Sequence, residues 1–339
     1  MSDFHTLPYD EQVTRLQATA EQALLHAGMP CTAIELVSYE NNAVFRTSHE
    51  HDPDCAVRVY RPGAKTRAEI ESEQVWLTLL DVAGGLRVPT PNRPLYAGTL
   101  DGVEGEVYVG MWYWLDGESL PAAEHTPGLV QRIGAYMATL HQITVQVQPP
   151  FAKPGDAVLA QRPQLDYEGL FGERSPYASE QESDLINPAQ QTVLDAVAGQ
   201  VRHVMTALDT DNHTTGLIHG DLIYKNTLIG PDGTVAALDF DDCGFGYFLY
   251  DMACPLLFYK PLPAYADLKA ALWDGYTAVR SLPGHYRGML EVLVAGRYVA
   301  SCRWVAAHAD HPAIRGRADE IIAGRVDELR GFLDSGQLR

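Results

Sequence analysis

The chain has 339 residues, of which 46% are hydrophobic and 20% are charged, normal proportions for a globular protein with a sizeable core. This composition argues against a disordered or fibrous chain, and the length suggests about two domains or one two-lobed unit. Asp and Glu outnumber Lys and Arg by 44 to 25, and the resulting net charge of −19 disfavours nucleic acid or an anionic membrane as a partner and favours a cationic small molecule.

Hydrophobic periodicity predicts a strand-rich first third of the chain. The expected elements are a helix over 10–27, strands over 33–39, 43–48 and 55–60, a helix over 65–80 and a strand over 108–115. Asp10 is the expected N-cap of the first helix, and Gly28 marks its end. The polar residues 40–42 predict a hairpin turn, and residues 85–99 form a connection rich in Pro and Gly.

The remainder of the chain has a mainly helical pattern. The expected elements are a helix over 127–143, an irregular proline-rich stretch over 147–185, a helix over 188–208, short strands at 216–220 and 235–240, and mainly helix over 250–335. Pro188 suits the first helical position after Asn187. A strand-rich part followed by a helix-rich part predicts an α+β protein, with the change near residue 113.

Cysteine usage and the ends of the chain indicate a cellular compartment. The five cysteines include no C-x-x-C pair, and their odd number fits neither a disulfide framework nor a zinc site. The first residues lack the basic and apolar regions of a signal peptide, and the apolar stretch MLEVLVAG is too short to span a membrane. We therefore expect a cytoplasmic protein with reduced thiols, and the oligomeric state stays open.

The strongest local signal is the loop HGDLIYKN, which ends at Asn226, followed by an apolar strand that ends in the sequence DFDD. Phosphoryl transfer needs a carboxylate that orients a hydroxyl and accepts its proton, together with oxygen ligands for Mg²⁺. Asp221 and Asn226 supply one base and one amide ligand, and an aspartate at the end of the strand supplies a carboxylate ligand.

These motifs resemble those of the aminoglycoside phosphotransferase/choline kinase family, whose members are small-molecule relatives of protein kinases. H-G-D-L-x-x-x-N and D-F-D match the protein-kinase patterns H-R-D-L-x-x-x-N and D-F-G in order and role. The resemblance implies a two-lobed protein-kinase-like fold. Its antiparallel-sheet N-lobe would span residues 1–112, and its mainly helical C-lobe residues 113–339.

The resemblance also implies roles for the residues of the two motifs. Asp221 is expected to be the catalytic base, and Asn226 and Asp239 to hold Mg²⁺ against ATP. Asp241 is an alternative ligand, but Asp239 directly follows the apolar strand. Asp251 matches a family residue that is expected to brace the catalytic loop. His141 and His219 are expected to have structural roles.

The N-terminal third carries the matching nucleotide-binding residues. The strand Cys55-Ala56-Val57-Arg58 resembles the kinase V-A-I-K strand, in which the small residue caps adenine and the basic residue contacts phosphates. Ala56 and Arg58 are two residues apart and share one face of the strand. Glu73 is expected to face inward from the next helix and to pair with Arg58. Most relatives have lysine at the position of Arg58. The planar guanidinium of arginine presents several N–H donors, whereas the lysine ammonium is a compact charge.

Two further segments are expected to contact the nucleotide. Asn41 and Asn42 lie in the hairpin turn that replaces the G-x-G-x-x-G loop, and they can donate hydrogen bonds to phosphate. Backbone groups around Met111–Tyr113 are expected to bind adenine, as in the family's interlobe linker. The alternatives are a plain polar hairpin and aromatic packing.

The acceptor is left open by the sequence. Its candidate residues are Asp166, Tyr167 and Glu168 in the irregular stretch and Arg297, Tyr298, Arg303 and Trp304 in a late helix. Acidic residues would bind amines, and an aromatic cage would bind a quaternary ammonium. The whole pattern resembles most the homoserine-kinase-type and Ser/Thr-kinase-like branches.

We therefore expect an ATP-dependent kinase that phosphorylates a hydroxyl of a small molecule, such as an amino acid, an amino alcohol or a sugar. A Ser/Thr protein kinase shares all of this chemistry. A nucleotide-binding pseudokinase is a further alternative, because Arg58 replaces lysine and the glycine loop is absent. The choice between ATP and GTP and the number of Mg²⁺ ions stay open.

Overall fold

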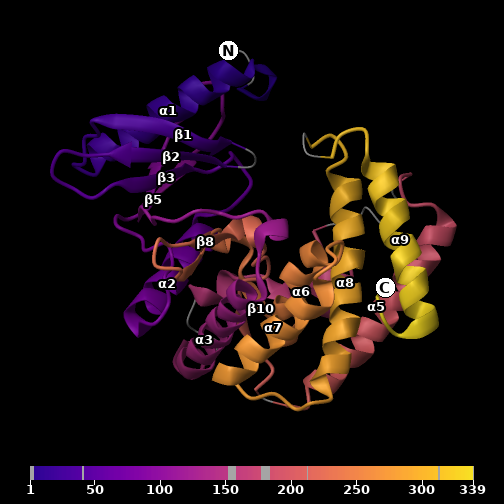
Figure 1. Ribbon diagram of the computed structural model, residues 1–339. Coiled ribbons are helices and arrows are strands. Elements are labelled where there is room, and N and C mark those ends of the chain that lie inside the picture. The colour runs from indigo at the N-terminus through magenta and orange to yellow at the C-terminus, as the bar shows by residue number, and fades with distance from the viewer. Residues whose placement is uncertain are drawn as a thin grey trace. The chain divides into compact units, whose positions relative to one another are not determined.

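The computed structural model describes residues 4–39, 42–151, 158–176, 184–211, 213–311 and 314–338. Its contacts divide the chain into two compact units (Figure 1). The first unit comprises Met1–Gly117, Ala152–Arg162 and Ala236–Asp241, and the second comprises Glu118–Phe151, Pro163–Val235 and Asp242–Arg339. Strand β9 (Val235–Ala237) carries the chain from the second unit into the first, and the 3-10 helix η6 (Phe240–Asp242) carries it back.

The first unit contains a five-stranded antiparallel sheet in the order β1-β2-β3-β5-β4. Its elements are η1 (Phe4–Thr6), α1 (Tyr9–His26), β1 (Ala33–Tyr39), β2 (Ala43–Ser48), β3 (Cys55–Val59), α2 (Arg67–Ala83), β4 (Tyr96–Gly98), β5 (Val107–Tyr113) and η3 (Leu159–Gln161). Alternating burial along β2 and β3 directs Phe45 and Val57 into a core that Leu16 and Leu24 of α1 complete.

Helix α2 has a well-defined start that places its acidic residues. Thr66 and Glu69 form a capping box, in which Thr66 N–H donates to Glu69 Oε2 at 2.8 Å and Glu69 N–H donates to Thr66 Oγ1 at 3.3 Å. The helix buries Ile70, Glu73 and Leu77 on one side. The predicted inward direction of Glu73 is therefore confirmed.

The second unit is mainly helical. Its helices are η2 (Ala122–Glu124), α3 (Pro127–Phe151), α4 (Tyr167–Leu170), α5 (Pro188–Leu208), η5 (Tyr224–Asn226), α6 (Phe248–Tyr259), α7 (Tyr265–Val279), α8 (Tyr286–Ala307) and α9 (Ala318–Ser335). Its strands are β6 (Gln164–Leu165), β7 (Thr215–Ile218), β8 (Thr227–Ile229) and β10 (Gly244–Tyr247), and β10 pairs with β6 in parallel and with β7 antiparallel. Helices α3 and α7 approach closely because Gly134 and Gly275 lack side chains: a Cβ on either would meet a backbone carbonyl of the other helix.

The predicted order of helices and strands is confirmed, with local differences. Helix α1 begins after Pro8, which has no side-chain cap, and Asp10 lies inside the first turn. Helix α3 continues past residue 143 to Phe151, and the strands β4, β6, β8 and β10 lie in segments where no strand was predicted. Among the described residues, no helix is both long and apolar enough to cross a membrane.

Candidate active site

The loop between β7 and β8 brings Asp221 and Asn226 together. Asn226 Nδ2 donates to the main-chain oxygen of Asp221 at 2.9 Å and to its Oδ2 at 3.3 Å. Gly220 adopts φ = +80°, a left-handed conformation that favours glycine and turns the chain just before Asp221. Because the Asn226 amide nitrogen faces the carboxylate, its amide oxygen remains available to a metal ion.

A network of buried hydrogen bonds holds this loop in place. Asp251 of α6 accepts hydrogen bonds from the backbone N–H of His219 at 3.1 Å and of Gly220 at 2.8 Å. His141 of α3 pairs through Nε2 with Asp251 at 2.9 Å and through Nδ1 with the hydroxyl of Tyr276 at 2.9 Å. Burial alone would raise the pKa of Asp251, but His141 and the loop N–H groups hold it below its ordinary value. Asp251 thus braces the loop, as predicted.

Asp221 also forms an ion pair that the sequence did not predict. Arg297, which projects from α8, donates through Nη2 to Asp221 Oδ1. Burial raises the pKa of Asp221 above its ordinary value; Arg297 opposes this shift, and the charge of Asp242 adds to it. The sequence analysis named Arg297 only among the acceptor candidates, because it lies 76 positions from Asp221 and no local pattern connects the two.

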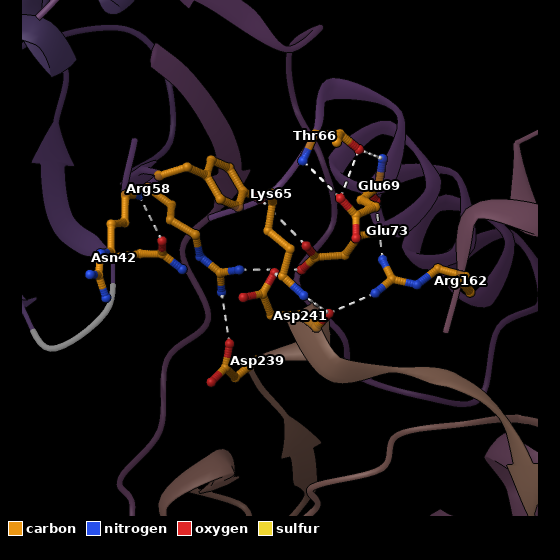
Figure 2. A network of polar contacts seen from close by, with 11 residues as sticks. Asn42, Arg58, Lys65, Thr66, Glu69, Glu73, Arg162, Asp239 and Asp241 are labelled. Carbon is orange, nitrogen blue, oxygen red and sulfur yellow. Dashed lines mark hydrogen bonds and ion pairs between the residues drawn. The ribbon is translucent and has the colours of Figure 1, made fainter. Parts of the chain in front are cut away.

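In the first unit, Arg58 joins two carboxylates (Figure 2). Its Nη1 lies 3.4 Å from Glu73 Oε1, and its Nη2 lies 3.4 Å from Asp239 Oδ1. The expected Arg58–Glu73 ion pair is therefore present. The Glu73 side chain is only 2% exposed, and this burial raises its pKa, while Arg58 opposes the shift.

Asp239 has the properties of an available metal ligand. Its φ of 62° is left-handed, and it is the only residue other than glycine with a positive φ in the described part of the chain. Such backbone conformations in non-glycine residues cluster at functional sites. Its side chain is 52% exposed, whereas Asp241 is 21% exposed and lies 3.9 Å from Lys65 Nζ. These observations favour Asp239 over Asp241 as the ligand.

Arg162 anchors the turn that carries Asp239 and Asp241. Its side chain is buried, and it donates to the carbonyl of Glu69 at 3.1 Å and to the carbonyl of Asp241 at 2.6 Å (Figure 2). Lys65 Nζ donates to the same Asp241 carbonyl at 3.2 Å. Sequence reasoning missed Arg162, because it is a single arginine in an irregular stretch far from both partners.

The predicted nucleotide-binding residues of the hairpin and of β3 have different environments. Ala56 and Arg58 lie on the less buried face of β3, as predicted. Asn42 Oδ1 accepts a hydrogen bond from Arg61 N–H at 3.0 Å, so this oxygen stabilises the turn. Asn41 lies outside the described residues.

The segment from Met111 to Tyr113 lies within strand β5. The Met111 carbonyl accepts from Asn92 N–H at 3.0 Å, and Tyr113 N–H donates to the Thr90 carbonyl at 3.0 Å. The side chain of Met111 is part of the hydrophobic core. Two of the backbone groups that we assigned to adenine are therefore engaged in hydrogen bonds with residues 90–92.

Most of the chain matches a known protein family. The model of a family described as the phosphotransferase enzyme family matches residues 33–287. The chain belongs to this family. The predicted family is thus confirmed, and the predicted kinase-like α+β fold is confirmed by solved structures that include an aminoglycoside 2'-phosphotransferase and a choline kinase.

Individual relatives of this phosphotransferase-family protein agree with that assignment. An uncharacterised protein of Deinococcus radiodurans is 32% identical over 228 residues, which cover 65% of this chain and 60% of the relative. The structure of a microcompartment-associated aminopropanol kinase has a TM-score of 0.80 at 24% identity, covering 95% of this chain and 99% of its own. The amicoumacin kinase hAmiN, in complex with AMP-PNP, Ca²⁺ and Ami, has a TM-score of 0.74 at 18% identity, covering 96% of both chains. At these identities the structural likeness shows the fold.

Proposed function

We propose that this family member is an ATP-dependent kinase that transfers the γ-phosphate to a hydroxyl group of a small molecule. The observation that carries the proposal is the braced loop in which Asn226 holds Asp221. Asp221 orients the acceptor hydroxyl and accepts its proton while the hydroxyl oxygen attacks the γ-phosphorus. The bond from the γ-phosphorus to the bridging oxygen breaks, and ADP leaves. The raised pKa of Asp221 suits a general base, because it makes the carboxylate more basic than an exposed aspartate.

The remaining predicted residues serve the nucleotide in this proposal. Arg58, held by Glu73, would contact the phosphates, and Asn226 Oδ1 and the Asp239 carboxylate would hold Mg²⁺. When bound, Mg²⁺ neutralises charge on the β- and γ-phosphates. Ala56 lines the adenine site, and we expect backbone groups beyond the Tyr113 N–H to bind adenine, because the Met111 carbonyl and the Tyr113 N–H are already engaged.

Two findings favour a small-molecule kinase over the other hypotheses. Arg58 makes the ion pair with Glu73 that the kinase lysine would make. The replacement of lysine by arginine is therefore a weak argument for a pseudokinase. Two of the similar solved structures, an aminopropanol kinase and an amicoumacin kinase, are named for small-molecule acceptors. The nucleotide analogue and Ca²⁺ in the amicoumacin kinase complex agree with a nucleotide and a divalent metal.

The test is transfer of γ-labelled phosphate from Mg-ATP to a panel of homoserine, serine, choline, sugars, aminoglycosides and protein substrates. Asp221→Asn should reduce turnover by about 10²- to 10⁴-fold, because it removes the base, while calorimetry shows retained Mg-ATP binding. Asp319→Asn, at an exposed position of α9, is the matched control and should keep full activity. Unchanged turnover in Asp221→Asn would refute the assignment of the base, and label only in proteins would favour the protein-kinase alternative.

A further inference from the structure

The candidate active site contains a cation that proton abstraction does not require. We propose that Arg297 binds an anionic group of the acceptor, and that the acceptor is therefore a hydroxyl compound with a carboxylate a few bonds from the phosphorylated oxygen. This inference rests on the proposed kinase function, because it takes Asp221 as the group that contacts the acceptor hydroxyl.

The position of Arg297 makes a ligand contact possible. Its side chain is 21% exposed and that of Asp221 is 27% exposed, so solvent reaches the pair. Asn226 occupies Oδ2 of Asp221, and Arg297 Nη2 occupies Oδ1. Arg297 Nε is buried and has no hydrogen-bond partner within the described residues, and Tyr250 also lies next to the guanidinium. A guanidinium has five N–H donors, so Arg297 retains donors for a second anion.

An arginine at this place works against the catalytic base. Its guanidinium occupies Oδ1 of Asp221, an oxygen that the acceptor hydroxyl would approach. A carboxylate on the acceptor resolves this conflict. The guanidinium binds a carboxylate through two parallel hydrogen bonds, and Asp221 Oδ1 is then released to the hydroxyl of the same molecule.

The charge of the surroundings favours a carboxylate over a phosphate. The charge of Asp242 acts on Asp221, and the whole chain carries −19. One guanidinium balances one carboxylate, whereas a phosphate dianion would leave uncompensated negative charge beside Asp221 and the γ-phosphate.

The residues that were expected to bind an amine have other partners. Asp166 accepts from Gly169 N–H at 2.8 Å and pairs with Arg174 at 2.7 Å. Glu168 pairs with Arg202 at 3.1 Å, and the same guanidinium lies 3.9 Å from the ring centre of Tyr167. The acidic and aromatic side chains of this stretch therefore support its local structure.

The other candidates on α8 also have structural partners. Tyr298 donates to Glu328 at 3.1 Å, the buried Arg303 donates to the Phe171 carbonyl at 2.7 Å, and Trp304 stacks on His308. Of the candidates on this helix, Arg297 is the one that contacts Asp221. Among the candidates on α8, Arg297 is therefore the residue that we expect to contact the acceptor.

The experiment compares acceptors that differ only in the carboxylate: homoserine with 3-amino-1-propanol, serine with ethanolamine, and glycerate with ethylene glycol. Wild-type kcat/KM should be about 30-fold or more higher for the carboxylated member of a pair, as expected for a charge-assisted bidentate contact. Arg297→Gln should remove this preference mainly through KM. Arg297→Lys should retain part of it, because the charge remains and the fork is lost. Arg287→Gln, an exposed position on the same helix, is the control and should keep the preference.

Binding without nucleotide separates this inference from the proposed function. Calorimetry should show that homoserine or glycerate binds the wild-type protein and loses at least about 10-fold in affinity in Arg297→Gln. If no carboxylated compound binds, or if Arg297→Gln binds them equally well, the inference is refuted. Phosphorylation of uncharged or purely cationic acceptors with the same KM in both proteins would refute it while supporting the kinase. A preference for glycerol 3-phosphate over glycerate would refute the carboxylate and show that Arg297 binds a phosphate of the acceptor.

Discussion

The substitution of lysine by arginine at position 58 changes what the residue can reach. A lysine presents one compact ammonium, whereas the planar guanidinium of Arg58 contacts Glu73 and Asp239 through different nitrogens, each at 3.4 Å. Glu73 is buried, and the charges of Asp239 and Asp241 add to the burial that raises its pKa. Arg58 is therefore the main group that keeps Glu73 ionised.

Loss of Arg58 should destabilise the protein in a pH-dependent way. Arg58→Met leaves a buried carboxylate without its cation, a change that typically costs about 3–5 kcal/mol of unfolding free energy. Glu73 then binds a proton in the folded state at a pH where the unfolded chain has lost it. Stability must therefore fall as pH rises above the ordinary glutamate pKa, so the loss measured by urea unfolding should be greater at pH 8 than at pH 5.

The double variant Arg58→Met/Glu73→Gln is the internal control for that experiment. The neutral amide needs no cation, so most of the lost stability should return and the pH dependence should disappear. A double variant no more stable than Arg58→Met would show that packing against Trp112, whose ring centre lies 5.2 Å from the Arg58 guanidinium, dominates instead.

The second residue-scale prediction concerns the base. Asp221 is faced by Arg297 from α8, by Asp242, by Asp251 of α6 and by its neighbour His219, and burial raises its pKa. Arg297 lowers that pKa, so Arg297→Gln should raise it further. The acid limb of the kcat/KM profile should move to higher pH in Arg297→Gln and stay nearly in place in Arg297→Lys. If the acid limb of the profile moves to lower pH in Arg297→Gln, or does not move, then Arg297 does not control the pKa of the base.

At the scale of elements, two glycines decide how closely α3 and α7 pack. A Cβ on Gly275 would meet the backbone carbonyl of Gln131, and backbone cannot move aside as a flexible side chain can. Gly275→Ala should therefore destabilise the protein by about 1–3 kcal/mol through overpacking. The same substitution at Gly199 in α5, where nothing lies within 4 Å, should stabilise it by about 0.5–1 kcal/mol through helix propensity.

Thermal unfolding of the two alanine variants checks this difference in sign. Because α3 also carries His141, which contacts the brace residue Asp251, Gly275→Ala should lower kcat as well, whereas Gly199→Ala should not. Equal stability of both variants would mean that α3 and α7 can separate without strain.

Local patterns predicted most elements, because caps and apolar periodicity act over a few residues. The Asn187 cap and Pro188 fixed the start of α5, where a capping box is present. The side-chain partners of Arg162 and Arg297 were not predictable, because they lie 76 to 93 residues away in the chain. The hydrogen bond at the Met111 carbonyl was not predictable for a related reason: an apolar run does not reveal that residues 90–92 lie beside it.

The same division between local and distant signals applies to the candidate site. Asp221 and Asn226 are five residues apart, and their contact follows from one loop. The Arg58–Glu73 pair, 15 residues apart, was predictable from strand alternation and helix spacing. The contact of Arg297 with Asp221 was not predictable, and the proposed carboxylated acceptor rests on this contact.

At the scale of the whole molecule, the net charge of −19 opposes the ligands that the proposed function requires. Mg-ATP is an anion, and a carboxylated acceptor is anionic or zwitterionic. Long-range repulsion from the protein should slow the approach of Mg-ATP, although Arg58 attracts it at short range. Raising the ionic strength from 0.01 M to 0.15 M shortens the Debye length from about 30 Å to about 8 Å, which screens the distant charges more than the partly buried guanidinium.

Salt in this range should therefore raise kcat/KM for Mg-ATP, by about 2- to 10-fold if net charge controls the approach. Steady-state kinetics in sodium chloride, with the acceptor saturating, provides the measurement, and sucrose at equal osmolality is the control for solvent effects. Chloride that competed for Arg58 would act in the opposite direction, so a rise has one explanation. A steady fall of kcat/KM with salt would instead show that local cations dominate the field that the nucleotide meets, despite the acidity of the chain.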